Sequence, residues 1–143
     1  MNIMILGARL ILGLIFFVFG LNGFLGFIEI PPLPEAAGAF LGALSATGYL
    51  FPLVKGLEVL AGLALLAGVF VPLSLLVLAP IVVNIVAFHA VLAPDGMFVP
   101  VLTLVLGIVV AWGYRSAFAP LFEPRRPTDT KDAPARTAAA TAA

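Results

Sequence analysis

Lys55 and Glu58 lie three residues apart at the start of an otherwise apolar run, residues 59–71. On a helix this spacing puts both side chains on neighbouring parts of one face, where opposite charges can pair. An ionisable residue inside a membrane helix is costly, and by default it faces the interior of a helix bundle or a wet cavity. The sequence therefore predicts that other helices shelter Glu58 and its partners.

The composition is that of a membrane protein. Hydrophobic residues make up 63% of the 143-residue chain and charged residues only 10%, with a mean hydropathy of +1.23. A soluble domain carries roughly a quarter charged residues. Most of the Lys and Arg residues follow Pro124, so the apolar part has no basic stripe, and nucleic-acid binding has no support. The absence of cysteine excludes disulfides, thiol redox chemistry and cysteine-ligated metals for this chain.

Four apolar segments are long enough to cross a membrane, which takes about 20 residues. The predicted spans are about residues 3–27, 52–70, 73–92 and 97–118. Three prolines in residues 29–35 predict a loop, and the short Gly- and Ala-rich segment 36–50 predicts an interfacial or re-entrant helix. We therefore predict an all-α fold, with a four-span bundle in residues 1–118 and a disordered cytoplasmic tail in residues 119–143.

The first predicted span carries a stripe of glycines. At about 100° per residue, one helical face is shared by Arg9, Gly13, Phe16, Gly20 and Gly23. Small residues on such a face let a neighbouring helix approach closely. Arg9 is either an anchor that reaches the membrane surface or a structural residue that faces inward, and its helical phase favours the inward position.

Charges at the ends of the predicted spans indicate the orientation. The C-terminal flank begins with Arg115 and is basic, whereas the loops at the other end contain Glu29, Glu35 and Asp95 and no Lys or Arg. By the positive-inside rule, both termini are expected to be cytoplasmic, in a plasma or inner membrane.

This orientation gathers polar side chains in the outer half of the predicted bundle. They are Asn22, Lys55, Glu58, Asn84 and His89. One interpretation is a ligand or proton site, in which His89 exchanges protons near neutral pH. The other is structural: Lys55 and Glu58 neutralise each other, and the remaining groups tie helices together with about 0.6 to 2 kcal/mol each. The sequence leaves both interpretations open.

The sequence lacks the usual signatures of catalysis. His89 has no second His or Cys with which to form a metal site. A G-x-S-x-G nucleophile motif and a phosphate-binding glycine fingerprint are also missing. Enzymatic activity therefore has no support, and no cofactor is evident. Binding of a quinone or a lipid stays open, because an apolar binding cleft requires few diagnostic residues in the sequence.

The first predicted span resembles the first helix of the DoxX family. It reads ARLILGLIF from Ala8 and GLNGF from Gly20. Further residues similar to one DoxX-like branch are Glu58, Gly62, Pro80, Asn84 and His89. The resemblance covers residues 7–118. Where many members carry a Lys near the end of the first helix, this chain has Asn22 and Gly23.

The resemblance implies a four-helix membrane bundle, with Arg9 and Glu58 as family-typical polar positions. Family members are linked to sulfur oxidation, terminal oxidases and oxidative-stress complexes. We therefore expect a non-enzymatic accessory or assembly subunit with an outward-facing polar pocket. The partner is expected to be a membrane protein or, through the glycine faces, a second copy. The alternative is binding of a quinone, a lipid or another small amphipathic molecule in redox chemistry or transport.

Overall fold

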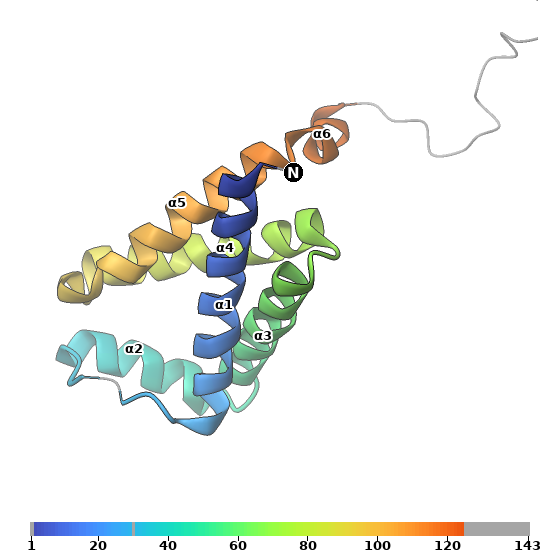
Figure 1. Ribbon diagram of the computed structural model, residues 1–143. Helices are drawn as coiled ribbons and strands as arrows, with labels where there is room; N and C mark the ends of the chain where they lie inside the picture. The colour runs from blue at the N-terminus through green and yellow to red at the C-terminus, as the bar shows by residue number, and fades with distance from the viewer. Residues whose placement is uncertain (1, 30, 125–143) are drawn as a thin grey trace, which may run out of the picture.

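The computed structural model describes residues 2–29 and 31–124, and all regular elements of that part are helices (Figure 1). They are α1 (Ile3–Leu25), α2 (Glu35–Ala46), α3 (Leu50–Ala67), α4 (Val71–Val91), η1 (Pro94–Gly96), α5 (Phe98–Gly113), α6 (Arg115–Phe118) and η2 (Ala119–Phe122). The predicted all-α class is confirmed. The first three long helices begin and end within three residues of the predicted spans.

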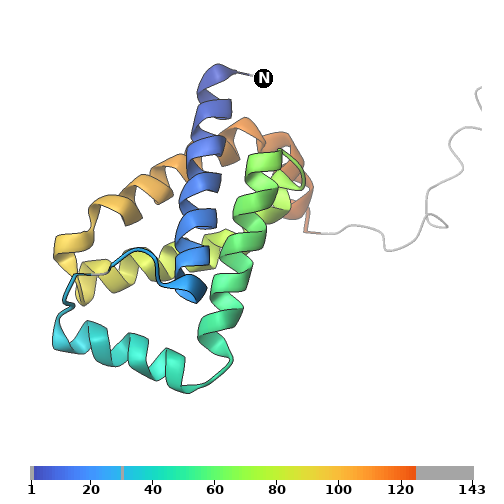
Figure 2. The same cartoon turned by 60° about the horizontal axis from the view of Figure 1, so that its bottom comes forward.

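The glycine stripe of α1 lies against α3. In Figures 1 and 2 the two helices run side by side, and they make the most extensive contact of any two helices. A Cβ atom added to Gly62 would lie 2.5 Å from the Phe17 backbone nitrogen and 2.8 Å from the Gly13 carbonyl oxygen. The two backbones are therefore in direct contact, which only glycine permits.

The other two long helices complete a closed set of contacts. α4 contacts α3 and α5, and α5 contacts α1. In both views α4 and α5 cross α1 obliquely rather than running parallel to it (Figures 1 and 2). The shared core is apolar, and its most deeply buried side chains include Leu12, Leu65, Leu78 and Val110. Together these contacts build one core from four helices.

The short helix α2 lies at the opposite end of the molecule from the N-terminus (Figure 2). Its 12 residues rise about 18 Å, too little to cross the hydrocarbon layer. α2 contacts the start of α3, and Phe40 packs against Phe88 of α4 with 5.6 Å between ring centroids. α2 therefore connects the ends of two long helices.

Three helices, α1, α3 and α4, are each long and apolar enough to cross a membrane. α4 is a single helix that continues through Pro80. A fourth span exists if α5 is joined to residues Arg115–Phe122 across a bend of 81°. The 16 residues of α5 rise only about 24 Å, less than the roughly 30 Å of a hydrocarbon core.

The predicted span at residues 97–118 is not one continuous helix. Tyr114 leaves the helical conformation at φ −106° and ψ 17°, and its N–H is shared between the carbonyls of Val110 and Ala111 at 3.1 Å each. This contact ends α5 directly after Gly113, and the chain turns sharply. Residues 119–122 were predicted to be disordered but form η2. The rest of the predicted tail, residues 125–143, lies outside the described residues.

Candidate functional site

The charged pair at the start of α3 forms a salt bridge. Lys55 Nζ lies 2.8 Å from Glu58 Oε2, one turn away on the same helix. The Glu58 side chain is 4% exposed and that of Lys55 is 21% exposed. Lys55 Nζ also lies 5.8 Å from the centroid of the Phe51 ring, which suits a cation–π contact. The carboxylate is thus the buried member of the pair, and the ammonium lies nearer the surface.

The end of α1 covers this pair because two of its residues have no side chain. A Cβ atom added to Gly20 would lie 2.9 Å from the Val59 backbone nitrogen and 3.1 Å from Glu58 Cβ. A Cβ atom on Gly23 would lie 2.5 Å from Lys55 Cγ and Cδ. The glycine face therefore leaves the space that Lys55 and Glu58 occupy. A neighbouring helix shelters Glu58, as its burial cost requires.

Asn22 is bound within the chain turn that follows α1. Its Oδ1 accepts a hydrogen bond from the Ile28 N–H at 2.6 Å, and its Nδ2 donates to the Ile28 carbonyl at 3.3 Å. Gly26, with φ 62°, reverses the chain between them. The Asn22 amide is therefore engaged in closing this turn, and the residue is 8% exposed.

We expect Asn22→Ala to lower the free energy of unfolding by about 1 to 2 kcal/mol, because two backbone groups of Ile28 lose their partner. Thermal unfolding in detergent, together with hydrogen exchange at the Ile28 amide, measures this loss. Asn22→Asp separates the two bonds, since its carboxylate still accepts from the Ile28 N–H but cannot donate to the Ile28 carbonyl. An Asn22→Ala protein with unchanged exchange at Ile28 would contradict the assigned role.

The two polar residues of α4 have different surroundings. His89 Nδ1 lies 2.9 Å from the Ile85 carbonyl oxygen, and because a carbonyl only accepts, Nδ1 carries the proton. The His89 ring also meets Phe88 edge-on at 5.0 Å and lies against Gly96 of η1. Asn84 is exposed on α4. Among the described residues, neither side chain is hydrogen-bonded to Lys55 or Glu58. The five candidate side chains therefore occupy four settings, and only Lys55 and Glu58 share one.

Arg9 faces inward at the other end of the α1–α3 pair. It is 8% exposed, and its guanidinium lies directly against Gly68, the residue that ends α3 with φ 75°. The Arg9 Nε is buried without a hydrogen-bond partner in the described part of the chain. The helical phase of Arg9 indicated its inward direction, but no sequence pattern identified Gly68 as the residue it contacts.

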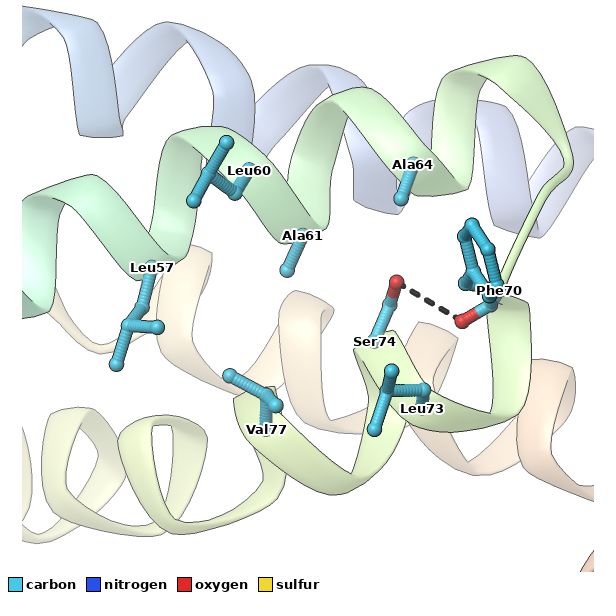
Figure 3. Close-up of a pocket in the computed structure, with 8 residues that line it drawn as sticks. All are labelled: Leu57, Leu60, Ala61, Ala64, Phe70, Leu73, Ser74 and Val77. Carbon is cyan, nitrogen blue, oxygen red and sulfur yellow. Dashed lines mark hydrogen bonds between the residues drawn. The ribbon is translucent and has the colours of Figure 1, made fainter.

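Two apolar grooves are lined by other residues than the charged pair. One, of about 200 Å³, lies between α3 and α4 and is lined by small residues such as Ala61 and Ala64 (Figure 3). Its one hydroxyl, Ser74 Oγ, donates to the Phe70 carbonyl at 3.1 Å (Figure 3). The other, of about 220 Å³, lies between α1, α4 and α5. Neither groove is lined by any of the five candidate side chains. The sequence analysis did not anticipate them, although small residues at helical spacing on α3 were a usable signal.

The described residues contain no group of three His, Asp or Glu side chains that could hold a metal ion. The chain matches no protein-family model, no curated protein and no solved structure. The functional assignment therefore rests on the residues and contacts of this chain.

Proposed function

We propose that this chain is a DoxX-like, four-span protein of a plasma or inner membrane that acts as a non-enzymatic accessory or assembly subunit of a membrane complex. Both termini are assigned to the cytoplasm. In support, the start of α1 and the segment α6–η2 lie toward the same end of the molecule in both views (Figures 1 and 2). Arg115 lies at that end, whereas Glu35 begins α2 at the opposite one. This distribution agrees with the positive-inside rule.

The observation that carries the proposal is the exposed amide of Asn84. It lies 13 residues after Val71, or about 20 Å along α4, well inside a membrane-spanning length. Its neighbour Val83 is 65% exposed, so the surrounding helix face is apolar and uncovered. An amide without partners in hydrocarbon costs several kcal/mol. A helix of a partner membrane protein with its own polar side chain would satisfy it.

The other polar groups in the outer half are engaged within the fold. Lys55 pairs with Glu58, Asn22 binds Ile28, and His89 donates to Ile85. The alternative function, a site for a quinone or lipid built around Lys55 and Glu58, has less support, because neither side chain lines either groove. A helix-packing role for the charged pair and a partner-binding role for Asn84 together favour the accessory function.

Site-specific photo-crosslinking in membranes tests this proposal. We expect a photoreactive residue at Val83, beside Asn84, to give one discrete adduct with another membrane protein. The same residue at Leu63, 51% exposed on α3, is the matched control and should give mainly lipid adducts. We expect Asn84→Leu to reduce the Val83 adduct about fivefold, which corresponds to the loss of one interhelical hydrogen bond of about 1 kcal/mol. Adducts with lipid only, or with a second copy only, would contradict the accessory role.

A further inference from the structure

Arg9 is a cation in an unusual position. It is more than nine-tenths buried, and its Nε–H has no acceptor in the described part of the chain. Among the described residues, the one ion pair joins Lys55 to Glu58, at the other end of α3, and Arg9 forms none. Buried polar groups are normally hydrogen-bonded, and an orphaned one requires an explanation.

The residue beside Arg9 explains part of its position. Gly68 ends α3, and the carbonyls of Ala64 and Leu65 already accept from the N–H groups of Gly68 and Val69. The partial negative charge at this helix end favours a nearby guanidinium. Because Gly68 has no side chain, the guanidinium can lie directly on the backbone. The helix end thus stabilises the charge of Arg9 but supplies no acceptor for its Nε–H.

A second feature of the same corner also favours an anion. Three residues, Gly68 to Phe70, connect α3 to α4, and Phe70 has a left-handed φ of 51°. The first turn of α4 receives no side-chain cap, and its second residue is Pro72. The N-terminus of a 21-residue helix carries free N–H groups and a partial positive charge. Arg9 lies against Gly68, the first of the three residues that precede this helix end.

We infer that Arg9 and the turn that joins α3 to α4 form a binding site for a phosphate group. The guanidinium would donate to phosphate oxygens, and the uncapped N–H groups of α4 would add donors from the other side. A planar guanidinium suits this role because its donors match the spacing of phosphate oxygens.

The depth of the corner fits a lipid headgroup. Arg9 follows Ile3 by six residues, or about 9 Å along α1, and the turn lies where two predicted spans end. The ends of membrane-spanning helices lie in the polar layer that flanks the hydrocarbon core. Phe70 is 74% exposed at the same corner, where an acyl chain would pass. The phosphodiester of an anionic lipid is one source of the phosphate, and soluble inorganic phosphate is the other.

Binding to the full chain in a neutral detergent tests the inference. The probes are phosphatidylglycerol, a galactolipid with the same acyl chains but no phosphate, and inorganic phosphate, with bound species counted by native mass spectrometry. We expect phosphatidylglycerol to bind the wild-type protein about tenfold more tightly than the galactolipid. Binding of inorganic phosphate instead would also support the site and identify a soluble source. Equal binding of both lipids, with no binding of inorganic phosphate, would overturn it.

Two variants locate the site. We expect Arg9→Gln to weaken phosphatidylglycerol binding by about ten- to hundredfold. Arg9→Lys, which keeps the charge but loses the paired N–H donors of the guanidinium, should weaken it by less. Arg115→Gln is the matched control, because Arg115 is an exposed cation at the same end of the molecule and should change binding by less than about twofold. Equal losses in the Arg9 and Arg115 variants would indicate a diffuse charge effect and overturn the site.

A measurement on the wild-type protein keeps the inference testable if the Arg9 variants do not fold. We expect phosphatidylglycerol to slow hydrogen exchange at the backbone amides of residues 68–73, and the galactolipid to leave it unchanged. Protection confined to the segment around Arg115 would place the lipid elsewhere and overturn the site.

Discussion

Lys55→Met is expected to destabilise the protein by about 3 kcal/mol, the largest effect of any substitution proposed for this chain. It removes the ammonium that lies 2.8 Å from Glu58 and leaves the carboxylate, whose side chain is 4% exposed, without its partner. Breaking a buried pair costs more than the pair itself contributes, because the remaining charge stays desolvated. Unfolding of the purified protein by sodium dodecyl sulfate in mixed micelles, followed by circular dichroism, measures the change.

The reciprocal and double variants are the controls. Glu58→Gln should cost less, about 1 to 2 kcal/mol, because the Lys55 side chain is 21% exposed and can reach water. The double variant Lys55→Met/Glu58→Met should recover to within about 1 kcal/mol of the wild type, since two apolar side chains replace the two charges. A double variant as unstable as Lys55→Met would show that the loss does not come from an unpaired buried charge.

Gly62→Ala is expected to destabilise the protein by about 1 to 3 kcal/mol through overpacking. The added methyl group would lie 2.5 Å from the Phe17 backbone nitrogen and 2.8 Å from the Gly13 carbonyl oxygen. Backbone atoms of α1 cannot move aside as a flexible side chain can, so α1 and α3 must separate. Thermal unfolding in detergent measures the loss, and crosslinking between α1 and α3 reports the separation.

Gly56→Ala is the matched control on the same helix. A Cβ atom at Gly56 has nothing within 4 Å, so the substitution adds no clash. Alanine is the better helix former, and we expect a gain of about 0.5 to 1 kcal/mol. Equal effects of the two substitutions, in either direction, would contradict the direct backbone contact between α1 and α3.

These two predictions concern the same interface. The charged pair and the glycine contacts lie along α3, and each fits α1 in one register only: Gly20 and Gly23 cover Glu58 and Lys55, while Gly13 meets Gly62. A pair that is costly to expose penalises any slip of one helix along the other. We therefore regard Lys55 and Glu58 as a device that fixes the register of α1 on α3. On this view, loss of the pair would disturb the partner surface of α4 indirectly.

The sequence by itself determined the local features of this protein. Apolar runs of about 20 residues predicted the three long helices, since hydrophobic length is a property of each segment alone. The salt bridge between Lys55 and Glu58 follows from their three-residue spacing on one helix, and the glycine face of α1 follows from its period. These features depend on neighbours within a turn or two, which the sequence contains directly.

Only the tertiary structure decided which of the polar groups meet. Helical period gives a direction around one axis, but not the angle at which a second helix crosses it. Asn84 and His89 were therefore placed in the same outer half as Glu58, with a shared site left open, whereas in the structure Asn84 is exposed on α4 and His89 lies against Gly96 of η1. For the same reason no pattern predicted that Arg9 would lie on Gly68, which is 59 positions away in the chain. Contacts between distant segments depend on how whole helices pack, and that geometry is a property of the assembled fold.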